Sequence, residues 1–219
     1  LVAQVFGDDG REQLVQGLSS DDWELRAACV VAMAELSGEH VVEHVAFALG
    51  DDHRLVRIAA ADSLSRLRDD EGVALGLDAL HDALVASEPQ VVVAAARALG
   101  AVGDERSVGR LLSVVETGED GAGAALRAAV SIDPDAVDLD LILATAQASV
   151  VVAALELLPA DDQRWKTVLS HPAPSVRRQA VQSFARFGQR SLLRARLELE
   201  VDPTVREVLE GALGNRRDP

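Results

Sequence analysis

Residues 51–69 read Asp51-Asp-His-Arg-Leu-Val-Arg-Ile-Ala-Ala-Ala-Asp-Ser-Leu-Ser-Arg-Leu-Arg-Asp69, and most of the chain is a variation on this stretch. Apolar residues recur at helical spacing from Val56 to Leu67, and Asp52 precedes them where a helix N-cap is expected. Arg57 directly follows the first apolar residue. The stretch therefore predicts an amphipathic helix that begins just after Asp52.

Equivalent first apolar positions, called anchors below, recur every 26 to 35 residues. They are Leu25, Val56, Val91, Ala122, Val150, Val176 and Val205. A second apolar segment precedes each anchored one, and these segments predict first helices over 11–18, 39–49, 72–85, 108–115, 137–145, 164–169 and 192–199. A period of this length fits two helices and two turns.

The starts of the anchored helices carry their own signals. Proline stands two residues before three anchors, where its fixed φ suits the first helical turn. These prolines are Pro89, Pro174 and Pro203. Side chains suited to capping lie beside the helix starts, namely Asp21, Asp52, Ser87 or Glu88, and Asp202.

Three stretches carry a common motif: Trp23-Glu-Leu-Arg26-Ala-Ala, Leu55-Val-Arg57-Ile-Ala-Ala and Ser175-Val-Arg177-Arg-Gln-Ala, with Thr204-Val-Arg206 carrying it in part. With the period and the preceding Asp, this motif resembles HEAT repeats, in particular the group typified by phycobilisome-lyase repeats. The resemblance implies an all-α fold, a right-handed α-solenoid of about seven two-helix HEAT-like repeats. Its second helices would line a concave face, which is the usual binding surface of a solenoid.

We expect residues 1–219 to form a single HEAT-like repeat domain. Three glycines lie within 116–123, so we predict a loose or short second helix in the fourth repeat and a bend at 116–135. Because the chain begins at Leu1, inside an apolar element, we also expect it to be trimmed from a longer one.

Charge divides the chain unevenly. The net charge of the 219 residues is −15. Residues 1–162 hold 10 Lys/Arg against 30 Asp/Glu, whereas residues 163–219, the basic C-terminal end, hold 11 against 6. The acidic total argues against a general nucleic-acid binder. The single cysteine, Cys29, and the absence of a long apolar run predict a cytoplasmic protein without a membrane span.

The arginine that follows the anchor suggests two roles. In the first, the arginines form a row that binds anions. In the second, which the resemblance to HEAT repeats implies, they bind the turn aspartates and the neighbouring backbone and so join one repeat to the next. We favour the second interpretation for Arg26, Arg57, Arg177, Arg206 and Asp52.

The basic C-terminal end is the candidate partner surface. Six arginines there could dock an anionic partner or the acidic end of another copy, or they could form a solvated face. They are Arg177, Arg178, Arg186, Arg190, Arg194 and Arg196. Trp23 is a further candidate for partner binding, with core or turn packing as the alternative.

Motifs for catalysis or metal binding are missing. Glu39-His40 and Glu43-His44 superficially resemble the His-Glu helix starts of deoxyhypusine hydroxylase, a HEAT-repeat di-iron enzyme, but no later repeat holds a counterpart. The acidic run 133–140 lacks the glycine and glutamate of a calcium loop and suits helix capping. Cys29 takes the place of a small core residue. We therefore predict no catalytic residue, no cofactor and no metal site, and so no enzyme.

The leading hypothesis is a non-catalytic scaffold or adaptor that binds a protein partner through the concave face. One alternative is a bilin-lyase-like or chaperone-like HEAT protein. The other is a nucleic-acid-binding DNA-repair HEAT protein, which the acidity disfavours because such a protein needs a basic groove.

Overall fold

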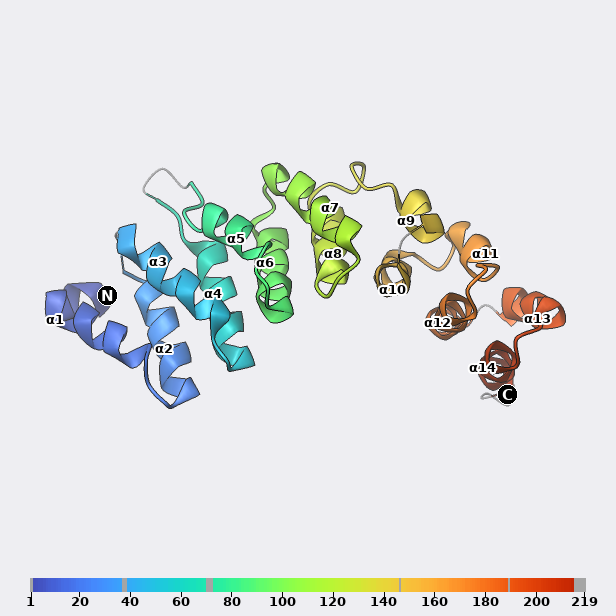
Figure 1. Cartoon of the computed structure of the whole chain (residues 1–219), viewed down its shortest axis with the longest axis horizontal. Helices are drawn as coiled ribbons and strands as arrows, with labels where there is room; N and C mark the ends of the chain where they lie inside the picture. Colours follow the sequence, from blue (N-terminus) through green and yellow to red (C-terminus); the bar gives the residue numbers. More distant parts are fainter. Residues whose placement is uncertain (1, 37–38, 70–72, 146, 189, 215–219) are drawn as a thin grey trace. The chain divides into compact units, whose positions relative to one another are not determined.

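The computed structural model describes residues 2–36, 39–69, 73–145, 147–188 and 190–214 (Figure 1). Its contacts divide the chain into two compact units, Leu1–Val137 and Asp138–Pro219. The expectation of a single domain over 1–219, with a bend at 116–135, stays a prediction.

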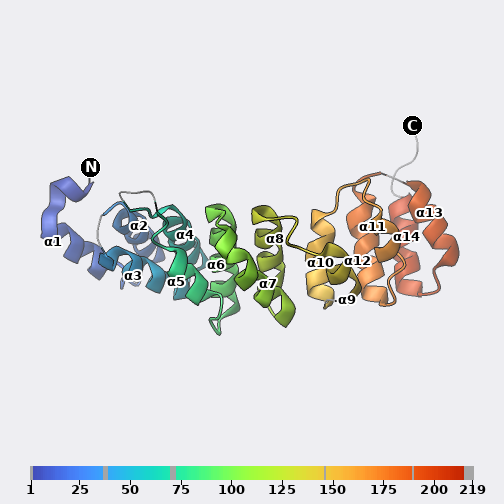
Figure 2. The same ribbon diagram turned by 90° about the horizontal axis from the view of Figure 1, so that it is seen from above.

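The first unit is a row of helix pairs (Figures 1 and 2). The second helices α2, α4, α6 and α8 pack side by side in chain order, and the first helices α3, α5 and α7 pack against them. The elements are α1 (Val2–Gly17), α2 (Trp23–Ala34), α3 (Glu39–Phe47), η1 (Ala48–Gly50), α4 (Arg54–Arg66), α5 (Leu77–Ala83), α6 (Pro89–Val102), η2 (Glu105–Ser107), α7 (Val108–Thr117) and α8 (Ala122–Ile132).

The second unit repeats the arrangement. Its second helices α10, α12 and α14 pack in sequence, with α9, α11 and α13 as their first helices. The elements are α9 (Leu139–Thr145), α10 (Ala148–Leu157), α11 (Arg164–Val168), α12 (Pro174–Ala185), α13 (Arg190–Leu199) and α14 (Pro203–Gly214). The prediction of an all-α fold made of stacked helix pairs is confirmed.

The anchors stand near the starts of the second helices, and all but the first are buried. Leu25 is 47% exposed and is the exception among them. Leu25 lies on α2, which begins the row of second helices in the described chain. The side of α2 that carries Leu25 therefore has no preceding second helix to pack against.

The prolines and Asp202 stand at helix starts as predicted, whereas the other predicted caps do not act: neither Asp21 nor Asp52 is an N-cap residue, and Glu88 at the start of α6 makes no side-chain cap bond. The three prolines begin α6, α12 and α14, and Asp202 Oδ1 accepts hydrogen bonds from the Thr204 and Val205 N–H groups at the start of α14. Asp52 does not cap α4, because His53 is the N-cap residue and makes no side-chain cap bond. In the preceding repeat the cap is Asp22, not Asp21.

One first helix is shorter than predicted. Of the expected span 72–85, α5 covers only Leu77–Ala83, and Gly72 lies outside the described residues. The backbone before α5 forms a short antiparallel bridge instead of a helical turn. Asp69 N–H donates to the Val73 carbonyl, and Leu75 N–H donates to the Leu67 carbonyl.

The glycine-rich segment precedes a regular helix. With 11 residues α8 is the shortest of α2, α4, α6 and α8, as predicted, but six of its residues are buried, so the prediction of a loose helix is wrong. Gly118 and Gly121 lie outside the helices, where they take φ values of 66° and 107° at the α7 C-terminus and the α8 N-terminus. A Cβ at Gly121 would stand 2.7 Å from Val92 Cγ1, so glycine also permits the close approach of this turn to α6.

Candidate functional site

A polar residue stands five positions before six of the seven anchors, and an alanine stands there before Val91. We call this place the turn position; in chain order it holds Ser20, Asp51, Ala86, Thr117, Thr145, His171 and Glu200. In five repeats its side chain accepts a hydrogen bond of 2.8–3.2 Å from the backbone N–H two residues later. Sequence reasoning missed this position, although aligning the repeats on their anchors would have revealed its polar character.

In the four repeats where an arginine follows the anchor, that arginine folds back onto its own turn position. Nη1 of Arg26, Arg57 and Arg177 donates to the carbonyl oxygen of the turn-position residue at 2.8, 2.6 and 2.8 Å. Arg206 Nη1 does the same at 3.0 Å. A shared contact of this kind ties the helix to the turn that precedes it.

Two of these arginines also reach the turn position of the next repeat. Arg26 donates from Nε and Nη2 to the two carboxylate oxygens of Asp51 at 2.7 and 2.8 Å, and Nη2 also contacts Asp52 at 2.6 Å. Asp51 is nearly buried by this contact, whereas the Asp52 side chain is 90% exposed. The main partner of Arg26 is thus Asp51, which the sequence analysis did not select.

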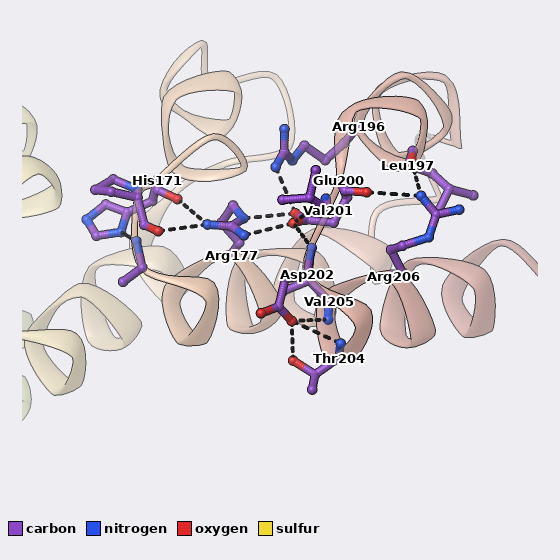
Figure 3. Close-up of polar contacts among 12 residues, drawn as sticks. His171, Arg177, Arg196, Leu197, Glu200, Val201, Asp202, Thr204, Val205 and Arg206 are labelled. Carbon is purple, nitrogen blue, oxygen red and sulfur yellow. Dashed lines mark hydrogen bonds and ion pairs between the residues drawn. The ribbon is translucent and has the colours of Figure 1, made fainter.

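The second such pair lies in the other unit (Figure 3). Arg177 donates from Nε and Nη2 to the Glu200 carboxylate at 2.8 Å each, and Arg196 donates to Glu200 at 2.7 Å. The Arg177 side chain is 8% exposed and that of Glu200 is fully covered. Both pairs have the planar, two-bond geometry in which a guanidinium holds a carboxylate most firmly.

These contacts lower the pKa of both carboxyl groups. The Arg177 hydrogen bonds, helped by the Asp202 backbone N–H and Arg196, lower the pKa of Glu200 from 4.5 to about 2. Arg26 likewise holds the pKa of Asp51 below its usual value. Both acids are therefore charged at neutral pH, and each joins two successive repeats.

Arg57 lies beside a groove on the exposed side of the second helices. The groove has a volume of about 580 Å³ and is formed by α4, α6 and the turn before α8. Three arginines line it, Arg54, Arg57 and Arg97, together with the carboxylates Asp62 and Asp120. Ile58 and Val93 supply apolar lining between the charges.

The structure separates the six arginines of the basic C-terminal end. Arg177 and Arg196 are bound by Glu200, as described above. Arg186 lies over the Phe187 ring, 4.7 Å from its centroid, and Arg190 is half-buried at the start of α13. Arg178 on α12 and Arg194 on α13 are exposed. The arginines therefore do not form one continuous exposed set.

The other candidates lie in structural positions. Trp23 stacks on His53, with ring centroids 4.1 Å apart, at the junction of the first two repeats. His40 Nδ1 lies 3.4 Å from a Glu43 oxygen, and within the described residues no group of three or more His, Cys, Asp or Glu side chains could hold a metal ion. Cys29 is buried, and burial raises the pKa of its thiol.

None of the described helices is both long and apolar enough to cross a bilayer. A comparison with curated proteins gives no match.

Among solved structures, the chain is similar to the complex of CpcE and CpcF of phycocyanin lyase from Nostoc sp. PCC7120, at 18% identity over 94% of each chain with a TM-score of 0.45. Human deoxyhypusine hydroxylase in complex with glycerol is 18% identical, over 93% of this chain and 94% of that one, with a TM-score of 0.46. At these scores the likenesses indicate nothing further about this chain.

Family models match in two places. Residues 11–75 match HEAT repeats, and residues 91–117 match the PBS lyase HEAT-like repeat. These spans contain α2 to α4, most of α6 and all of α7, and with them the contacts of Arg26 and Arg57 and part of the groove lining. The chain therefore carries HEAT repeats, one of them of the PBS lyase HEAT-like type.

Proposed function

We propose that this protein is a non-catalytic scaffold or adaptor that binds a protein partner on its second-helix face. This face is the solvent-exposed side of α2, α4, α6 and α8 in residues 1–137. The observation that carries the proposal is the groove between α4 and α6, which lies on this face and combines arginine, carboxylate and apolar lining.

The composition of the groove supports a protein ligand. Arginine is enriched in protein interfaces because its guanidinium makes several directed hydrogen bonds and its stem packs on apolar surface. Arg54 and Arg97 are exposed here, and neither forms an ion pair within the described part of the chain. Stacked repeats continue the same face on both sides of the groove, so a partner could extend along neighbouring helices.

Site-specific photo-crosslinking tests the proposal. A benzophenone amino acid replaces Gln90, an exposed groove residue, and in a control variant replaces Glu105, which is exposed on η2 and does not line the groove. We expect a discrete crosslinked protein from the Gln90 position alone, and a complex of the same two proteins by light scattering. A monomer that crosslinks from neither position, at cellular salt concentration, would contradict the proposal.

The match of residues 91–117 to the PBS lyase HEAT-like repeat favours a second candidate, a bilin-lyase-like role. Titration with a bilin, followed by its visible absorbance, tests it. A saturable change in the bilin spectrum would favour this role over the scaffold if it is the same in the wild-type protein and in the variant that carries benzophenone at position 90.

A further inference from the structure

One arginine of the inter-repeat series has no carboxylate to bind. Arg57 Nη1 donates to the Asp51 and Asp52 carbonyls at 2.6 and 2.9 Å, as in the other repeats. Its Nε and Nη2 make no hydrogen bond within the described residues, and they are not among the buried unpaired atoms, so solvent reaches them. This is the edge of the guanidinium that Arg26 and Arg177 present to Asp51 and Glu200.

The reason is a single side chain at the next turn position. Where the second repeat has Asp51 and the seventh has Glu200, the third repeat has Ala86. The backbone there is alike: Asp51 N–H donates to the Ala48 carbonyl at 3.3 Å, and Ala86 N–H donates to the Ala83 carbonyl at 3.4 Å. The third repeat thus keeps this turn hydrogen bond but offers Arg57 no carboxylate at the turn position.

We propose that the groove binds an acidic segment of the partner protein, and that an Asp or Glu carboxylate of this segment occupies the free edge of Arg57. The inference rests on the proposed function and names the chemistry of its site. The incoming carboxylate would make the two parallel hydrogen bonds that Asp51 makes with Arg26 and Glu200 makes with Arg177.

Charge at the groove favours such a segment. Arg54 and Arg97 flank Arg57 in the groove lining, whereas residues 1–162 as a whole hold 30 Asp/Glu against 10 Lys/Arg. Asp62 and Asp120 also line the groove and would repel a dense polyanion such as nucleic acid. Ile58 and Val93 offer contact area for apolar side chains. The groove therefore suits a peptide with one or two carboxylates among apolar residues.

Restoring the missing carboxylate gives a direct test. In the Ala86→Asp variant the new side chain should bind Arg57 internally and so exclude the ligand, while Ala86→Asn is a matched control of the same shape without charge. The probe is a blocked octapeptide with two glutamates and two leucines, compared with its glutamine counterpart. The readout is the NMR signal of the Arg57 Nε–H group, assigned from its loss in Arg57→Lys.

We expect the glutamate peptide to shift the Arg57 Nε–H signal in both the wild-type protein and Ala86→Asn. The affinities of these two proteins for the peptide should agree within about twofold. The glutamine peptide should leave it unmoved. In Ala86→Asp the signal should already be shifted without peptide, and the affinity should fall at least tenfold, which corresponds to about 1.4 kcal/mol. The Arg26 signal should stay constant throughout, because Asp51 already occupies that arginine.

Three results would overturn the inference: equal peptide affinity in Ala86→Asp and Ala86→Asn, an equal response to the glutamine peptide, or a larger Arg57 shift with inorganic phosphate at matched ionic strength. Photo-crosslinking from position 90 distinguishes a failure of the acidic-segment inference from a failure of the scaffold proposal. A partner crosslink that persists in Ala86→Asp leaves the scaffold role standing and refutes the acidic segment. A crosslink lost in Ala86→Asp and kept in Ala86→Asn supports both.

Discussion

Neutralising Glu200 should destabilise the protein more than any other single loss of charge. Among the described residues Glu200 is the only buried carboxylate, and Arg177, its partner, is 7% exposed. Glu200→Gln keeps the shape of the side chain but leaves the Arg177 guanidinium buried beside a neutral amide. Removing one member of a buried pair typically costs about 3–5 kcal/mol, because the remaining charge is no longer compensated.

The pKa of Glu200 gives a magnitude of the same order. A fall from 4.5 to about 2 means that folding favours the charged carboxylate by about 3 kcal/mol at neutral pH. Because the folded pKa is the lower one, the unfolded chain binds more protons between these two values. The stabilisation is therefore complete above about pH 4.5 and is lost as the pH falls towards about 2.

Urea denaturation of both proteins across this pH range measures the effect. We expect the unfolding free energy of Glu200→Gln to be about 3 kcal/mol below that of the wild type at pH 7, and the difference to shrink steadily below about pH 4.5. Glu198→Gln, a change at an exposed position of α13 two residues before Glu200, should differ from the wild type by less than about 0.5 kcal/mol at every pH. A difference that is small at pH 7, or that does not change with pH, would refute the reasoning.

Further predictions concern the first unit. Asp51→Asn should lower the urea midpoint clearly, whereas Asp52→Asn, at a side chain that is 90% exposed, should cost less than about 1 kcal/mol; equal effects would contradict the assignment of the main partner. Gly121→Ala should cost about 1–3 kcal/mol because φ is 107° and the added methyl meets a neighbouring helix, whereas Gly109→Ala, with open space around it, should be neutral or stabilising by thermal unfolding. Cys29 should react with a thiol reagent far more slowly in the native protein than in urea, because the thiol is buried and its pKa is raised; similar rates would show an exposed thiol.

Periodicity predicted the fold because each repeat buries the same positions. Anchors such as Val56 and Val176 lie between successive helices, and the three prolines begin helices where their backbone geometry suits the first turn. The pattern failed at Leu25, where burial depends on a neighbouring helix that the described chain does not place there. It failed again at Gly121, because composition alone does not tell a glycine inside a helix from one in the turn before it.

The arginine contacts were only half predictable. A repeated arginine indicated a structural role, and its bond to the backbone of its own turn follows from local geometry in every repeat that has it. The carboxylate partner is a different matter, since it lies 25 residues after Arg26 and 23 residues after Arg177 and takes two different residue types. The exposed edge of Arg57 is harder still to foresee, because it results from an alanine in another repeat.

Arginine footprinting by mass spectrometry tests the central claim, that a partner binds at the α4–α6 groove, most directly. The full chain is treated with an arginine-specific dicarbonyl reagent, alone and with the partner captured by crosslinking. We predict that the partner protects Arg54, Arg57 and Arg97, and leaves the exposed Arg178 and Arg194 as reactive as in the free protein. Protection confined to Arg178 and Arg194, with unchanged reactivity at the groove, would contradict the account.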